Sequence, residues 1–259
     1  MIPLIEYHNV TVVRKQRAVL DGLSFQIGLG EHVAILGPNG SGKSSLVKTI
    51  TRELYPDPNK PDSWLKIMGK ERWNIFDLRP LLGVVSYDWV EICRREYSSY
   101  ETVLSGFFGS VGVWKNHHLT QEMERKAREV MERLELWHLA ARPTEELSTG
   151  ESRRVLIARA LVHDPKALIF DEPTNSLDMH ACRELREILR RIAAQGTGIV
   201  LVTHHLPDIV PEIERVILLK DGKVFAHGST PEMLTEARLR GVFGEGIEVM
   251  RKDGYYHGW

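Results

Sequence analysis

The chain has 259 residues, of which 42% are hydrophobic and 27% are charged, and its formal net charge is −1. This composition is typical of a globular protein with a sizeable core, and the near-neutral balance gives no electrostatic footprint for nucleic acid. No apolar run approaches the roughly 20 residues that cross a bilayer, and the first residues lack the pattern of a signal peptide. Two cysteines, Cys93 and Cys182, form no motif and are expected to be free thiols in a reducing compartment.

The first predicted elements are strands. Residues 4–13 and 23–27 alternate apolar and polar side chains, which predicts an antiparallel β-layer with a turn near Asp21-Gly22. The apolar run His32–Leu36 then predicts a strand that is buried on both faces, as strands of parallel sheets are.

A glycine-rich segment, residues 37–44, follows this strand and leads into a predicted helix that starts at Ser45. Strand, glycine-rich turn and helix form the context of a phosphate-binding P-loop. The glycines let backbone N–H groups point at a phosphate, and the helix N-terminus adds partial positive charge. Lys43 would reach the β- and γ-phosphates of a nucleoside triphosphate, and the Ser44 hydroxyl would ligate Mg²⁺. The predicted nucleotide-binding residues are Gly37, Pro38, Asn39, Gly40, Ser41, Gly42, Lys43, Ser44 and Ser45.

The middle of the chain changes from strands to helices. Short strands are predicted at residues 64–68 and 83–86, and helical periodicity then dominates. In the predicted helix at residues 121–136, one face carries the apolar side chains of Met123, Ala127, Val130, Met131 and Leu134. We therefore expect a helical subdomain at about residues 91–163.

An acidic pair ends the next predicted strand, residues 166–170. A P-loop fold needs carboxylates at this position, at the carboxyl end of a buried strand. Asp171 would hold Mg²⁺, directly or through water, and Glu172 would polarise the attacking water as a general base.

The last part of the chain completes an alternation of strands and helices. A helix is predicted at about residues 178–194, a buried strand at residues 199–202, and a hairpin that turns at Asp221-Gly222. This alternation predicts a doubly wound sheet that binds ligands at the carboxyl ends of its strands. The predicted fold class is α/β: a P-loop NTPase with a mostly parallel sheet, an antiparallel β-subdomain and an inserted α-helical subdomain, all within one domain over residues 1–259.

Together these segments resemble the ATP-binding-cassette (ABC) ATPases, and the resemblance covers nearly the whole chain. The family's D-loop corresponds to Ser176-Leu177-Asp178, and its switch histidine corresponds to His204. Its signature motif, usually Leu-Ser-Gly-Gly-Gln, corresponds to Leu147-Ser148-Thr149-Gly150-Glu151, ahead of a predicted helix. The order and spacing of all the motifs agree with the family.

The resemblance implies a division of labour between two copies of the chain. In the family, two cassettes pack head to tail, and each ATP lies between the P-loop of one copy and the signature of the other. Ser148 and the backbone that follows Gly150 would then contact the γ-phosphate in trans. Glu172, His204 and Lys43 would be the catalytic residues, and the neighbouring His205 has no counterpart in the family. ATP and Mg²⁺ are the implied cofactors.

The implied function is an ATPase subunit that powers transport through separate transmembrane permease subunits when ATP closes a homodimer. The chain would be cytoplasmic and held at the inner face of the cell membrane through these partners, with no nucleic acid involved. The tail at about residues 242–259 resembles those of import-type cassettes, including cassettes for metal-chelate or oxyanion uptake. Phe107 and Phe108, in the helical part, either line a groove for a partner helix or belong to the core.

A second reading is a soluble ABC protein that acts in translation, DNA repair or cluster assembly. Such proteins often carry two cassettes, a coiled-coil insertion or a basic arm, and the sequence shows none of these. A P-loop kinase or GTPase would not explain the signature, the D-loop and the histidine together.

The sequence departs from the family pattern in three places. Thr149 and Glu151 are mild changes within the signature. Arg14 stands where the family has an aromatic residue that stacks on adenine, and it either stacks its guanidinium group on the base or is a solvated charge. The Q-loop glutamine is missing, and Tyr87 and Asp88 stand in its place; we favour Asp88 as an additional Mg²⁺ ligand because carboxylate oxygens suit a hard cation.

Overall fold

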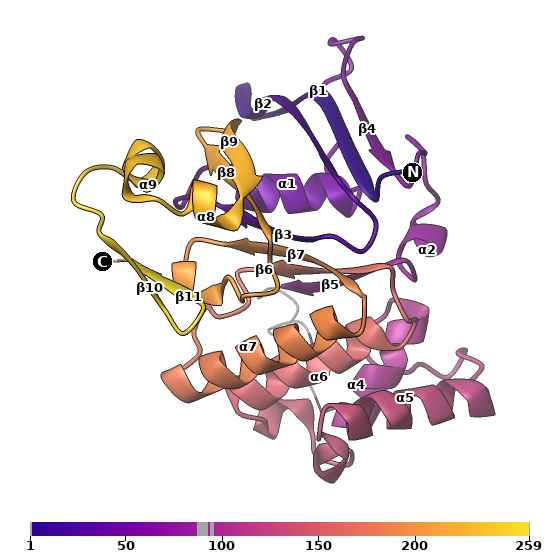
Figure 1. The fold of residues 1–259 in the computed structure, drawn as a ribbon. Helices are drawn as coiled ribbons and strands as arrows, with labels where there is room; N and C mark the ends of the chain where they lie inside the picture. The colour runs from indigo at the N-terminus through magenta and orange to yellow at the C-terminus, as the bar shows by residue number, and fades with distance from the viewer. Residues whose placement is uncertain (1, 87–92, 94–95, 259) are drawn as a thin grey trace.

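The two larger β-sheets and a group of helices are arranged in layers (Figure 1). The structure is a computed structural model that describes residues 2–86, 93 and 96–258. Six strands form the central sheet in the order β5-β6-β7-β3-β8-β9, and every neighbouring pair is parallel except β8 and β9. The strands are β3 (His32–Leu36), β5 (Leu82–Ser86), β6 (Ala167–Asp171), β7 (Gly198–Thr203), β8 (Arg215–Lys220) and β9 (Lys223–Ser229).

A second, antiparallel sheet has the order β2-β1-β4, where β1 is Ile5–Arg14, β2 is Arg17–Ile27 and β4 is Trp64–Ile67. Helix α1 (Lys43–Ile50) lies between the two sheets (Figure 1). It buries Leu46, Val47 and Ile50 in one apolar cluster with side chains of both sheets. The helix that follows the P-loop is therefore held from two sides by the core.

The turn between β1 and β2 differs from the prediction. It falls at Lys15-Gln16, which have φ values of 46° and 62°, so the prediction of a turn at Asp21-Gly22 is wrong. Gly22 instead lies inside β2 with φ 64°, where the register shifts and β2 carries one residue more than β1. A glycine with positive φ serves a β-bulge as well as a turn, so the Asp-Gly dipeptide by itself does not distinguish the two.

The chain between β5 and β6 forms the helices on the other face of the central sheet (Figure 1). The predicted apolar face of α5 (Gln121–Arg133) is confirmed: Ala127, Val130 and Met131 are buried, Leu134 follows them into the core, and the partly buried Met123 packs against it. Together with the two sheets described above, these helices confirm the predicted fold class: a mostly parallel sheet, an antiparallel layer and inserted helices. Helix α2 (Ile75–Leu78) precedes β5, and α7 (Met179–Ala194) follows β6. The described helices between β5 and β6 are α4 (Ser99–Leu104), η1 (Ser105–Phe108), α5 (Gln121–Arg133), η2 (Trp137–Leu139), η3 (Thr144–Glu146) and α6 (Thr149–Leu161).

The carboxyl-terminal part closes the fold with two hairpins. The predicted turn at Asp221-Gly222 joins β8 and β9, with φ values of 51° and 74°. The remaining elements are η4 (Leu206–Asp208), α8 (Thr230–Met233), α9 (Glu236–Phe243), β10 (Val249–Lys252) and β11 (Tyr255–Gly258). Over the described ranges, no helix combines the length and the apolar character needed to span a bilayer.

Candidate functional site

The P-loop is shaped by its neighbours as well as by its own glycines. A Cβ on Gly37 would collide with the carbonyl oxygen of Leu219, and one on Gly42 would lie 2.8 Å from the carbonyl oxygen of Val19. Gly42 has φ 104° and is the N-cap of α1, whose first turn holds no acidic residue. The helix therefore presents free N–H groups and positive dipole charge to the loop, which suits an anion.

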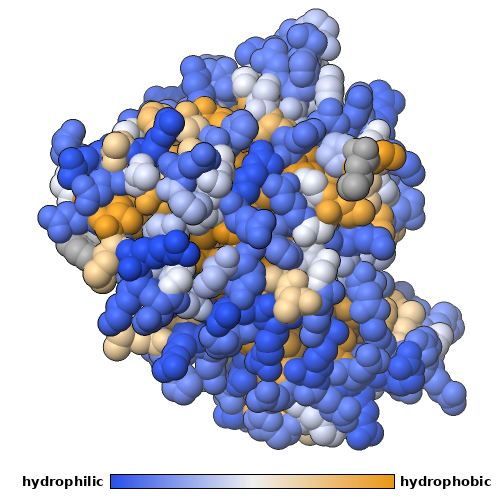
Figure 2. All heavy atoms as spheres, in the orientation of Figure 1, coloured by the Kyte–Doolittle hydropathy of each residue, from blue (hydrophilic) through white to orange (hydrophobic). Residues whose placement is uncertain are grey.

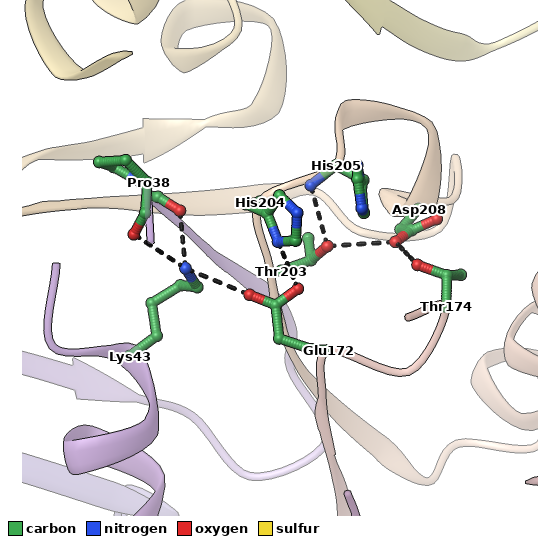
Figure 3. Close-up of polar contacts among 9 residues, drawn as sticks. Pro38, Lys43, Glu172, Thr174, Thr203, His204, His205 and Asp208 are labelled. Carbon is green, nitrogen blue, oxygen red and sulfur yellow. Dashed lines mark hydrogen bonds and ion pairs between the residues drawn. The ribbon is translucent and has the colours of Figure 1, made fainter. Parts of the chain in front are cut away.

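Lys43 is the charged residue of the loop, and only 5% of its side chain is exposed. Its Nζ donates hydrogen bonds to the carbonyl oxygens of Gly37 (2.8 Å) and Pro38 (3.0 Å). The same ammonium group lies 3.2 Å from Oε1 of Glu172, so that it bridges the loop and the end of β6 (Figure 3).

Glu172 also contacts the predicted switch histidine. Nδ1 of His204 donates to Oε2 of Glu172 over 2.6 Å, since the carboxylate is the acceptor (Figure 3). The parallel neighbours β6 and β7 bring the two residues together, and the Glu172 N–H donates to the carbonyl oxygen of Val202 at 2.8 Å. Glu172 has φ 48°, a conformation that a non-glycine residue keeps only where its surroundings enforce it.

The predicted Mg²⁺ ligands flank this cluster. Asp171 is the half-buried last residue of β6, and Ser44 is exposed on the first turn of α1. In the part of the chain that the structure describes, no group of three or more His, Cys, Asp or Glu side chains could hold a metal alone. A hydroxyl and a carboxylate nevertheless fit Mg²⁺, which takes few protein oxygens and completes its shell with water and substrate phosphates.

The signature segment forms the start of α6. Ser148 is its exposed N-cap in a capping box: Oγ accepts from the Glu151 N–H at 3.2 Å, and the Glu151 carboxylate accepts from the Ser148 N–H at 2.8 Å. Gln at the usual family position would form the same box, so Glu151 preserves the local geometry. Within the described ranges, no hydrogen bond or ion pair joins this segment to Lys43 or Glu172 of the same chain.

The structure brings the signature helix and the D-loop together instead. Gly150 packs so closely on α7 that an added Cβ would lie 3.1 Å from the Cβ of Ala181. Asp178 is the N-cap of α7, and its carboxylate accepts from the Ala181 N–H at 2.8 Å. The fully buried Arg153 of α6 also donates to the carbonyl oxygen of Asn175, just before the D-loop, at 3.4 Å.

Arg14 lies at the exposed end of β1, directly opposite Arg17 of β2. Two residues further along β2, Val19 touches the P-loop glycine Gly42. At a strand rise of about 3.3 Å per residue, the tip of this hairpin is within about 7 Å of that contact. The alternative between stacking and a solvated charge stays open. Tyr87 and Asp88, the predicted replacements of the Q-loop glutamine, lie outside the described residues.

A cavity of about 470 Å³ is lined by residues of α1, α2, β5, η1 and α6. Arg79, Arg159 and His163 line it, and Asp171 lies at one side of it. In the space-filling view the outline narrows on the right, between the part that carries α2 and the part that carries α4 and α5 (Figure 2). Phe107 packs against the core and meets the His163 ring edge-on, whereas the half-buried Phe108 stacks on the half-buried His117.

One acidic residue near the site was not singled out from the sequence. Asp208 is fully buried and accepts hydrogen bonds from Thr174, Thr203 and Arg186. The sequence does contain a signal for it: Asp208 is the single acidic residue in the otherwise apolar stretch Leu206–Val210. A charge buried among apolar residues is retained only when it is paired, so such a residue indicates a polar network.

Comparison with known proteins places this geometry in a family. A family model for ABC transporters matches residues 20–175. The chain is 33% identical to the phosphonates import ATP-binding protein PhnC 2 of Haloarcula marismortui, over 90% of this chain and 87% of that protein. It superposes on cbiO1 of Clostridium perfringens, part of the ABC transporter complex cbiONQ, with TM-score 0.77, 30% identity and coverage of 92% and 93%. The dimeric post-hydrolysis cassette MJ0796, bound to ADP and Pi, matches with TM-score 0.70, 26% identity and coverage of 87% and 98%.

Proposed function

The chain belongs to the ABC transporter family as an ATP-hydrolysing subunit that powers transport, and we propose that Glu172, His204 and Lys43 carry out the hydrolysis. The observation that carries this proposal is the position of Glu172, whose two carboxylate oxygens contact Lys43 and His204. A carboxylate held between a phosphate-binding lysine and a histidine is suited to accept the proton of an attacking water.

The steps follow from these contacts. The P-loop N–H groups and the N-terminus of α1 bind the phosphates, and Lys43 leaves Glu172 to reach the β- and γ-phosphates. Glu172, still held by Nδ1–H of His204, then accepts a proton as the water oxygen bonds to the γ-phosphorus and the bond to the β-phosphate oxygen breaks. Ser44 and Asp171 would hold Mg²⁺, which neutralises charge on the phosphates when it is bound.

We propose further that each site is completed by a second copy of the chain. The exposed N-terminus of α6, with Ser148 and Gly150, offers hydrogen-bond donors that lie apart from the Lys43–Glu172 cluster of its own chain. Head-to-tail packing supplies them to the γ-phosphate of the partner's ATP, so ATP closes the dimer and hydrolysis reopens it. The D-loop, at the start of α7 beside Gly150, moves with the signature.

Complementation tests this arrangement. Lys43→Ala removes phosphate binding from one kind of subunit, and Ser148→Arg blocks the signature in the other. Each variant alone should be inactive, and a mixture should recover part of the activity, because a mixed dimer contains one intact composite site. Glu172→Gln in place of Ser148→Arg is the control, since it damages the only site that Lys43→Ala leaves. A mixture that stays inactive would argue against sites shared between subunits.

We propose that a cytoplasmic helix of a separate membrane subunit docks in the cavity between α2 and η1. The cavity adjoins Asp171 and is bounded by two parts of the chain, so a helix seated there senses their relative position. The similarity to a phosphonate import subunit, together with the tail pattern, favours import of an oxyanion or chelated solute at the inner face of the cell membrane.

Membrane association tests this partnership. The chain with Arg79→Glu, at the cavity, should be lost from the membrane fraction of cells that contain the permease, whereas Arg125→Glu on the exposed face of α5 should be retained. Recovery of the wild-type chain only with ribosomes or DNA would favour the soluble alternative.

A further inference from the structure

The carboxylate of Asp208 is completely buried at the end of η4, four residues after His204. Its Oδ2 accepts hydrogen bonds from Oγ1 of Thr174 at 2.5 Å and Oγ1 of Thr203 at 3.1 Å (Figure 3). Its Oδ1 accepts from Nη2 of Arg186 at 3.1 Å. A buried ion is tolerated when its partners satisfy it in this way, and removing one of them leaves an uncompensated polar group.

Each of these partners lies close in the sequence to a different residue or segment of the proposed hydrolysis site. Thr174 is the second residue after Glu172, and Thr203 directly precedes His204. Arg186 belongs to α7, which begins directly after the D-loop. The Asp208 carboxylate therefore links three segments. These are the residues just after Glu172, the end of the strand just before His204, and α7, which follows the D-loop.

The segment that Thr174 anchors needs such support. Glu172 and Ser176 both have positive φ, of 48° and 65°, although neither is glycine. Thr174 lies midway between them with 7% of its surface exposed. Non-glycine residues keep left-handed backbone conformations only when the surrounding structure enforces them, and the Thr174–Asp208 hydrogen bond is an enforcing contact of this kind.

Thr203 has a second contact that orients the histidine loop. Its Oγ1 donates to Asp208 and accepts from the N–H of His205 at 3.0 Å, so the hydroxyl fixes the backbone just after His204. A valine at position 203 would keep the shape of the side chain and lose both hydrogen bonds. A serine would keep the hydroxyl.

We propose that Asp208 is a positioning residue for ATP hydrolysis, which holds Glu172 and His204 in register through Thr174 and Thr203. It does not touch the nucleotide and exchanges no proton. This inference rests on the hydrolytic roles proposed above for Glu172 and His204. A displacement of about 1 Å in reacting groups is enough to slow catalysis about 100-fold, so the network acts on turnover more than on ATP binding.

The test compares the variants Asp208→Asn, Thr203→Val and Thr174→Val with the wild-type chain. We measure kcat and KM for ATP hydrolysis, the Kd of a fluorescent ATP analogue, and the melting temperature. Each variant should lower kcat by about 10- to 100-fold while the Kd changes less than about 3-fold, and Thr203→Ser should recover most of kcat. Glu212→Gln is the matched control: Glu212 also binds α7, through Arg190 at 2.8 Å, but contacts neither threonine.

Three results would overturn the inference. The first is a kcat within about 2-fold of wild type in both Asp208→Asn and Thr203→Val. The second is a parallel fall of kcat, ATP affinity and melting temperature, which marks a purely structural role. The third is a loss of kcat in Glu212→Gln equal to that in the network variants. Should Asp208→Asn not fold, Thr203→Val, which buries no new charge, decides the matter. Glu172→Gln separates the two proposals. If Glu172→Gln turns over ATP at the wild-type rate, the role of Glu172 is refuted. If Glu172→Gln is inactive while Thr203→Val and Asp208→Asn are fully active, only the role of Asp208 is refuted.

Discussion

The ammonium group of Lys43 and the carboxylate of Glu172 form an ion pair with an Nζ–Oε1 distance of 3.2 Å, and 5% and 13% of their side chains are exposed. Lys43, which is proposed to bind the phosphates, thus neutralises Glu172, which is proposed to act on the attacking water. In the proposed mechanism, binding of the phosphates would exchange one anion for another around Lys43 and release Glu172 to act as a base, so charge would couple the two events.

This coupling predicts the behaviour of Glu172→Gln. Turnover should fall by about 100-fold or more because the general base is lost. ATP affinity should rise, since glutamine competes less strongly for the ammonium group, and the ATP-bound dimer should accumulate. Steady-state hydrolysis, nucleotide titration and size-exclusion chromatography measure the three effects. Lys43→Ala should instead lose ATP binding, and hydrolysis by Glu172→Gln at the wild-type rate would contradict the assignment.

Ser44 is expected to hold Mg²⁺ from the first turn of α1. Removing its hydroxyl in Ser44→Ala should raise the Mg²⁺ concentration needed for half-maximal turnover by at least the factor of about 10 that loss of an outer-shell contact costs. Chelation of the metal should abolish turnover in every variant. Ser44→Thr keeps the hydroxyl and is the control. An unchanged Mg²⁺ dependence in Ser44→Ala would remove this residue from the ligand set.

Arg14, at the tip of the β1–β2 hairpin, either stacks on adenine or is a solvated charge. If its guanidinium group stacks on adenine, Arg14→Ala should cost about 0.5–2 kcal/mol of ATP binding, equivalent to about 2- to 30-fold in Kd. Arg17→Ala is the matched control, because Arg17 is the exposed arginine directly opposite in the register. Equal effects of the two substitutions would indicate only a general attraction to the phosphates, and no effect of Arg14→Ala would leave it a solvated charge.

His163 makes part of the stability depend on pH. Burial beside the cavity lowers the pKa of His163, and its Nε2–H donates to the carbonyl oxygen of Gly106 at 3.3 Å. The unfolded chain then binds a proton more readily than the folded chain, so this residue makes stability rise with pH through the window below the ordinary histidine value and fall on acidification.

We therefore expect His163→Gln, which keeps a hydrogen-bond donor, to lose less stability than the wild-type chain between pH 7.5 and about 5.5. Urea unfolding at several pH values measures the difference, and His118→Gln on the exposed surface is the control. Identical pH dependence in the His163 variant and the wild-type chain would show that the imidazole is not responsible.

Two of the Asp-Gly dipeptides show how far local sequence can be trusted. Asp221-Gly222 turns a hairpin as predicted, whereas Gly22 forms a bulge inside β2 and the turn falls at Lys15-Gln16. Both glycines adopt positive φ, which is the property that the sequence encodes. Whether that conformation reverses the chain or bends a strand depends on which partner strand the flanking residues find, and that choice is made by packing.

The sequence alone determined the P-loop, the strands and helices around it, and the residue types available for hydrolysis, because glycine spacing and hydrophobic periodicity act on the local backbone. Only the tertiary structure decided that Glu172 lies between Lys43 and His204 and that Asp208 ties Thr174 to Thr203. These contacts depend on β6, β7 and β3 being neighbours in the sheet. That order results from the burial of many strand and helix faces at once, which no local pattern contains.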